Sequence, residues 1–175
     1  MNDNWRERLH LFLRQRIPLI STFLLMMLFM TPVGLMQVNY FRPMAGVCCV
    51  FYWVLKKEAF FGYFSAFIIG FCADIASSSP LGVNILLFLW LTFAAKWLAH
   101  YFRSATFGVN WFIFGLTFFC LVVLKWLLLM LYFGKVFSCS EILVNYLVTV
   151  MSYPLIAGIN WWIQRNFLPQ EKISE

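Results

Sequence analysis

Two ionisable residues, Asp74 and Lys125, lie within long apolar runs of this sequence. A charged side chain at such a position needs a partner or water. A single carboxylate could lock two segments together, dock a partner protein or take part in a proton relay. A relay needs several ionisable groups in series, which these two residues do not provide. The sequence therefore favours a structural lock or a docking role for Asp74.

The segment from Asp74 to Gly82 is a short polar interruption between two apolar runs. It contains three serines, of which Ser77 is the first, and Ser79 and Pro80 come next to one another. Serine is a favoured N-cap residue, and proline is tolerated at the first position of a helix. The segment therefore predicts a helix, a tight turn and a second helix, with Ser79 as N-cap and Pro80 at the first helical position.

Three partners could satisfy the Asp74 carboxylate. Lys125 and Arg42 are cations expected on the same side of the membrane, and either could form an ion pair with it. The amino end of the helix after Pro80 is the third, because its unpaired amides and its dipole favour an anion. The residues alone do not choose among these partners.

A stripe of small residues precedes this turn. Gly62, Ala66 and Gly70 recur every four residues before Asp74, so all four share one face of a helix. Small residues at this spacing let two helix backbones approach closely within a membrane. The stripe therefore predicts a helix-packing face that points Asp74 toward protein.

Neither a catalytic constellation nor a metal site is apparent in the sequence. It contains no paired carboxylates, no HExxH and no GxSxG, and the serines of the 74–82 segment have no histidine nearby. The five cysteines form no CxxC pair, and both histidines, His10 and His100, lie outside the apolar runs. We therefore expect a non-catalytic protein without a cofactor.

The composition is that of an integral membrane protein. Hydrophobic residues make up 63% of the 175 residues and charged residues 11%, against roughly 25% charged in a soluble domain. The length allows one domain. The net charge of +6 arises from basic residues that flank the apolar runs, which fits anionic lipid and membrane orientation better than nucleic acid.

The apolar runs predict an all-α polytopic protein with six transmembrane helices, at 19–38, 44–55, 59–73, 81–99, 111–133 and 142–163. The 44–55 run has only 12 residues, or roughly 18 Å of helix, so it is either a short span or a re-entrant segment. A kink is expected near Pro32 and Gly34 in the first span, and another at Pro154 in the last.

Basic residues fix the expected orientation. With six spans both termini lie on one side, and placing that side in the cytoplasm gives the inner segments ten Lys and Arg against two outside. The chain then divides into a basic cytoplasmic arm at 1–18, a transmembrane domain at 19–163 and a cytoplasmic tail at 164–175. The arm is either an amphipathic surface helix or a flank that only sets orientation. The inner residues are Arg6, Arg8, Arg14, Arg16, Lys56, Lys57, Lys96, Arg103, Arg165 and Lys172, and the outer ones are Arg42 and Lys135.

Several of these features together resemble the rod shape-determining protein MreD family. The family has an Arg-Pro pair at the start of its second span, as in Arg42-Pro43, and a GxxxD-x-x-SGS-x-LG turn between its third and fourth spans. The stretch 66–83 reads AFIIGFCADIASSSPLGV, with Ser78 in place of the usual glycine. The resemblance is good from Arg42 to about Leu91, and a late proline in the last span also fits.

The resemblance implies a non-catalytic subunit of the cell-elongation machinery in the bacterial inner membrane. Its expected partners are a bitopic MreC-like protein, the actin-like MreB, RodA and the elongation penicillin-binding protein, and it could form a homodimer. Asp74, Ser77, Ser79, Pro80, Gly82, Arg42 and Pro43 would then shape the outer surface or dock a partner. The family is also similar to vitamin-binding subunits of energy-coupling-factor transporters, which gives a second hypothesis. Those subunits have an alanine-rich first span, whereas 19–30 is bulky here.

Overall fold

The computed structural model describes residues 3–30, 43–56, 61–77, 80–103, 105–134 and 139–167. In these ranges the chain forms six α-helices and no strand, which confirms the predicted all-helical fold. The helices are α1 (Asp3–Met30), α2 (Ala45–Lys56), α3 (Tyr63–Ser77), α4 (Val83–Phe102), α5 (Phe107–Phe133) and α6 (Cys139–Phe167).

Three of the helices are long and apolar enough to cross a membrane. They are Val83–Phe102, Phe107–Phe133 and Ile142–Asn166. The apolar parts of α1, α2 and α3 are shorter, at Arg16–Phe29, Ala45–Lys56 and Tyr63–Ser77. The chain is therefore a helical membrane protein whose second half contains its three longest apolar segments.

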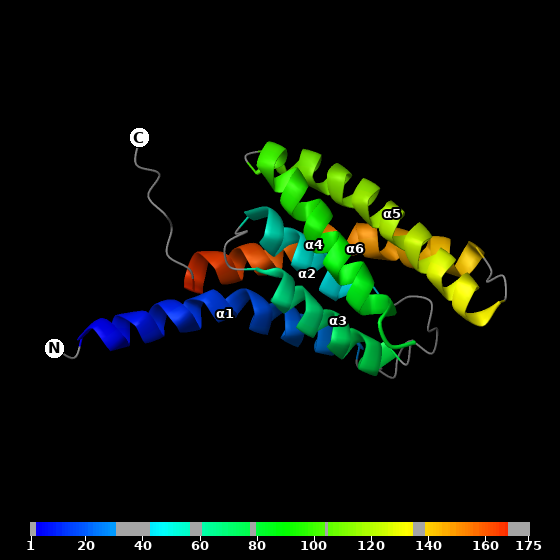
Figure 1. The fold of residues 1–175 in the computed structure, drawn as a ribbon. Coiled ribbons are helices and arrows are strands. Elements are labelled where there is room, and N and C mark those ends of the chain that lie inside the picture. Colours follow the sequence, from blue (N-terminus) through cyan, green and yellow to red (C-terminus); the bar gives the residue numbers. More distant parts are fainter. Residues whose placement is uncertain are drawn as a thin grey trace.

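The short helix α2 lies at the centre of the bundle (Figure 1). It contacts α1, α4 and α6, and every residue from Ala45 to Leu55 is buried. A uniformly apolar helix can be buried on all sides by protein or by lipid, and here its neighbours are other helices. The segment at 44–55 therefore acts as the core around which the longer helices pack.

Several predicted boundaries differ from the structure, and α5 and α6 extend beyond the predicted 111–133 and 142–163. The third helix is Tyr63–Ser77, four residues later at each end than the predicted 59–73. Ser77 is its last residue, and the Ser77 hydroxyl donates to the Ala73 carbonyl at 2.6 Å. At the amino end of the chain, α1 is continuous through Pro18, so the basic arm and the first apolar segment share one helix. Pro32 and Gly34 lie outside the described residues.

Aromatic rings join α5 to α6. Phe114 stacks on Tyr153 with ring centroids 4.2 Å apart, and Phe118 stacks on Tyr146 at 5.7 Å. Offset stacking of this kind adds to the burial energy of each ring. These pairs hold α5 and α6 together.

Helix α6 remains continuous at Pro154, where the sequence predicts a break or kink. Proline has no N–H, so the Val150 carbonyl four residues earlier loses its usual helical donor. The indole N–H of Trp111 on α5 donates to this carbonyl at 3.0 Å. A neighbouring helix thus supplies the hydrogen bond that Pro154 removes.

The α5–α6 pair extends beyond the turn between α3 and α4 (Figure 1). The short connection at 103–106 joins the end of α4 to the start of α5, and α5 has 27 residues against 20 in α4. Seven further residues add roughly 10 Å of helix. The ends of α2, α3 and α4 near Asp74 therefore form a shelf beside a taller wall made by α5 and α6.

Candidate functional site

Asp74 lies in the last turn of α3 and is 1% exposed. One carboxylate oxygen accepts the backbone N–H of Gly82 at 2.8 Å, and the other accepts that of Asn84 at 2.9 Å. Both donors belong to the amino end of α4. The carboxylate thus binds two amides that have no partner inside their own helix.

The N-cap of α4 differs from the sequence prediction. The helix begins at Val83 and its N-cap is Gly82, so Pro80 precedes the first helical residue by three positions. Gly82 has a φ of 103°, a left-handed conformation that favours glycine. Gly82 carries no side chain to cap the helix, and Asp74 of α3 takes over that role. Ser79 lies outside the described residues.

A small polar network surrounds this carboxylate. The Asn84 side-chain amide donates to the Ser77 hydroxyl at 3.1 Å, and Ser77 in turn donates to the Ala73 carbonyl. The network ties the first turn of α4 to the last turn of α3. Its members are hydrogen-bonded to each other or to backbone, so the arrangement is that of a helix-hairpin lock.

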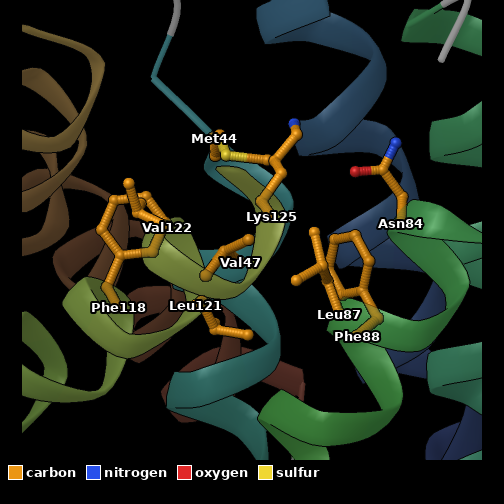
Figure 2. Close-up of a pocket in the computed structure, with 9 residues that line it drawn as sticks. All are labelled: Met44, Val47, Asn84, Leu87, Phe88, Phe118, Leu121, Val122 and Lys125. Carbon is orange, nitrogen blue, oxygen red and sulfur yellow. The ribbon is translucent and has the colours of Figure 1, made fainter. Parts of the chain in front are cut away.

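Among the predicted cationic partners, Lys125 is near Asp74 without being paired to it. The two charges interact electrostatically, but no ion pair within 4.0 Å joins them. Lys125, Asn84 and Met44 line a cavity of about 20 Å³ whose other walls are apolar (Figure 2). Arg42, the other predicted partner, lies outside the described residues. Pro43 lies two residues before the start of α2, and its carbonyl accepts the Ala45 N–H at 2.8 Å.

The small-residue stripe meets α4 at Gly70. A Cβ added to Gly70 would lie 2.6 Å from the Cα of Ile85, which is closer than side chains approach backbone in real proteins. Ala66 is fully buried, whereas a Cβ added to Gly62 meets nothing within 4 Å. The close backbone contact between α3 and α4 therefore depends on Gly70, and it places Asp74 against the α4 amides.

Polar contacts between α2 and α6 were not anticipated from the sequence. The Met44 N–H donates to the Thr149 hydroxyl at 3.2 Å, and the Tyr52 hydroxyl donates to Gln164 Oε1 at 2.9 Å. Between them, Asn160 donates to the Cys49 sulfur at 3.3 Å. Polar residues within an apolar helix usually face protein, so Thr149 and Asn160 could have indicated this interface.

Within the described ranges, no group of three His, Cys, Asp or Glu side chains is placed to hold a metal ion. The two hydrogen bonds to Asp74 occupy both of its carboxylate oxygens. The arrangement can hold the α3–α4 hairpin in shape and position the residues of the shelf.

A protein-family model described as rod shape-determining protein MreD matches residues 11–163, nearly the whole chain. No curated protein and no solved structure matches the chain.

Proposed function

Because this chain belongs to the MreD family of rod shape-determining membrane proteins, we propose that it is a non-catalytic scaffold of the cell-elongation machinery. In this role it would sit in the bacterial inner membrane and hold partner membrane proteins of peptidoglycan synthesis together. The proposal concerns how the chain contributes to rod shape.

The hydrogen bonding of Asp74 carries this proposal. The carboxylate is buried and accepts hydrogen bonds from two backbone N–H groups, and these bonds join α3 to α4. A catalytic or proton-carrying carboxylate needs access to a substrate or to a chain of further groups. Asp74 instead has the environment of a structural residue, which supports a scaffold.

We further propose six transmembrane spans with both termini in the cytoplasm. The ten-to-two distribution of basic residues supports this orientation. At the proposed inner end, the Lys56 ammonium donates to the Arg103 carbonyl at 3.2 Å, which brings the ends of α2 and α4 to one level. Trp161 and Arg165 form a cation–π contact on α6 at 5.5 Å, and aromatic and basic residues of this kind favour a membrane interface.

Partner binding would use the lateral faces of the bundle. A groove of about 490 Å³ between α1 and α6 is lined by Phe29 and by α6 side chains that include Leu147, Met151 and Leu155. These three α6 side chains are exposed. Grooves of this kind accept a transmembrane helix, and the proposed occupant is the single span of an MreC-like protein. MreB, RodA and the elongation penicillin-binding protein would join the same assembly, directly or through that partner.

The small-molecule alternative gains no support from the cavity beside Lys125, and it would need a larger pocket such as the groove of about 490 Å³ between α1 and α6. The cavity beside Lys125 is about 20 Å³, whereas pockets for small ligands typically measure about 300–1,000 Å³. A vitamin-sized molecule would not fit this cavity without separating α2, α4 and α5.

Photocrosslinking in living cells tests the scaffold proposal. A photoreactive residue at Met151 in the α1–α6 groove should capture a bitopic partner of the elongation machinery. The matched position is Phe112 on α5, which is 75% exposed and lies outside that groove. Equal capture at both positions, or capture of transporter coupling subunits at Met151, would contradict the proposal.

A further inference from the structure

Four cations from four different helices meet at one end of the bundle. They are Arg16 of α1, Lys56 at the last position of α2, Arg103 at the C-cap of α4 and Arg165 in the last turn of α6. We call this surface the basic end. The three arginines are exposed and Lys56 is partly buried. The basic end lies opposite the α3–α4 turn, because α4 runs from that turn to Arg103.

A contact between α1 and α2 places two of these cations at one level. The Trp53 indole N–H donates to the Ser21 hydroxyl at 3.2 Å, and the two helices run antiparallel (Figure 1). Lys56 lies three residues beyond Trp53, or about 4.5 Å of helix. Arg16 lies five residues before Ser21, or about 7.5 Å in the same direction. The two cations are therefore level to within about one turn of helix.

The ends of α4 and α6 lie at this level as well. The Tyr52 hydroxyl donates to Gln164 Oε1 at 2.9 Å, and Arg165 follows Gln164 directly. The Lys56 ammonium donates to the Arg103 carbonyl at 3.2 Å, so α4 ends beside α2. The basic end is therefore a broad face built from α2, α4 and α6, with α1 beside them.

The chain carries too few acids at this end to neutralise its cations. The segments on this side hold ten Lys and Arg but five acidic residues. These acids are Asp3, Glu7, Glu58, Glu171 and Glu175. Complete pairing would leave five positive charges. Asp74 is the one carboxylate among the described side chains, and it lies at the opposite end of the bundle. The basic end therefore attracts anions from outside the chain.

Lipid headgroups surround the rim of this face, whereas Lys56 lies at its centre. Helix α2 is enclosed by α1, α4 and α6, and the contact between Lys56 and the Arg103 carbonyl is exposed at its end (Figure 1). Arg165, by contrast, lies over the exposed ring of Trp161, a pair typical of a membrane interface. Lipid can therefore bind Arg165, but an anion above Lys56 has to come from the aqueous side.

We propose that the basic end binds an acidic segment of a water-soluble protein, with its carboxylates over Lys56 and Arg103. Carboxylates form charge-assisted hydrogen bonds with both types of cation. A protein segment suits a broad face made of several helix ends, whereas small ligands bind in concave pockets. The inference adds a soluble partner to the proposed scaffold. Placing that partner in the cytoplasm rests on the proposed topology, but the binding of an acidic segment does not.

A fluorescent polyglutamate peptide tests this surface. The full-length protein is placed in nanodiscs of zwitterionic phosphatidylcholine at about 0.1 M salt, where charges more than ~10 Å apart are largely screened. The peptide should bind, and Lys56→Gln should weaken its binding about fivefold, the effect of one close charge pair in water. Arg103→Gln should act similarly, and it keeps the backbone carbonyl that Lys56 binds. Retained melting temperatures show that the variants are folded.

Lys135→Gln is the matched control. It removes the same charge two residues beyond α5, at the other end of that helix from the basic end, and should leave the affinity unchanged. Equal weakening by Lys56→Gln and Lys135→Gln would show a nonspecific attraction to the net charge. That result, or no binding to the wild type, would overturn the proposal.

Nanodiscs that contain phosphatidylglycerol separate a soluble partner from lipid. Anionic discs repel the peptide, so its affinity should fall for every variant, but the ratio between wild type and Lys56→Gln should stay about fivefold. A ratio near one would show that lipid headgroups cover Lys56 and would overturn the proposal. Crosslinking at Met151 tests the groove between α1 and α6 independently, so failure here would leave the scaffold proposal intact.

Discussion

Replacing Asp74 with alanine removes the acceptor of two backbone N–H groups in one step. The carboxylate bonds to Gly82 and Asn84 are 2.8 and 2.9 Å long, and the site is almost completely buried. Each buried donor left without a partner costs about 1–3 kcal/mol. Asp74→Ala should therefore lower the free energy of unfolding by about 2–6 kcal/mol, a large part of the stability of a domain of this size.

Asp74→Asn should have about half this effect. The amide keeps one acceptor oxygen, but its NH₂ group faces a backbone N–H that it cannot accept from. It also loses the charge that interacts favourably with the amino end of α4. We expect a loss of about 1–3 kcal/mol, with Asp74→Asn intermediate between the wild type and Asp74→Ala.

The free energy of unfolding can be measured by titrating the purified protein in mild detergent with a denaturing detergent. Ser77→Ala serves as the control, because it removes the hydroxyl that binds the Asn84 side chain but leaves the carboxylate bonds intact. We expect it to cost about 1 kcal/mol. A value for Asp74→Ala within about 0.5 kcal/mol of wild type, or a Ser77→Ala loss equal to it, would refute the amide lock.

The remaining predictions concern helix contacts. Gly70→Ala should lose about 1–3 kcal/mol in the same titration, because its Cβ would overlap the α4 backbone, while Gly62→Ala should be near neutral; equal effects would refute the close approach at Gly70. Trp111→Phe should cost about 1 kcal/mol by removing the donor to Val150, and the cost should shrink in a Pro154→Ala background, where the helix supplies its own N–H. A double-mutant cycle measures that coupling, and strict additivity would contradict it.

The sequence predicted the helical class and the α3–α4 turn because both depend on local patterns. Long apolar runs identify membrane helices, and a polar segment containing proline and glycine identifies the turn. The amino end of α4 was also one of three predicted partners for Asp74. Choosing it required knowing how far Asp74 lies from Lys125 in space. The two residues are 51 positions apart in the sequence, so no local pattern encodes that distance.

Other features depend on tertiary packing and could not be predicted. The central position of α2 is one example, because its apolar residues would suit lipid and protein neighbours equally. The capping of α4 is another: Ser79 and Pro80 are good local signals, but a buried carboxylate from α3 and the conformation of Gly82 determine the start of the helix. The bond from Trp111 to Val150 likewise joins residues 39 positions apart.

Cell width measured against protein abundance tests the central claim that this chain supports rod shape as a scaffold whose fold depends on the Asp74 lock. Cells relying on Asp74→Ala should become wider as the abundance of the protein falls. Raising expression until the variant reaches wild-type abundance in the membrane should restore rods. Round cells at wild-type abundance would contradict the account, since they would show that the carboxylate acts in function beyond holding the fold.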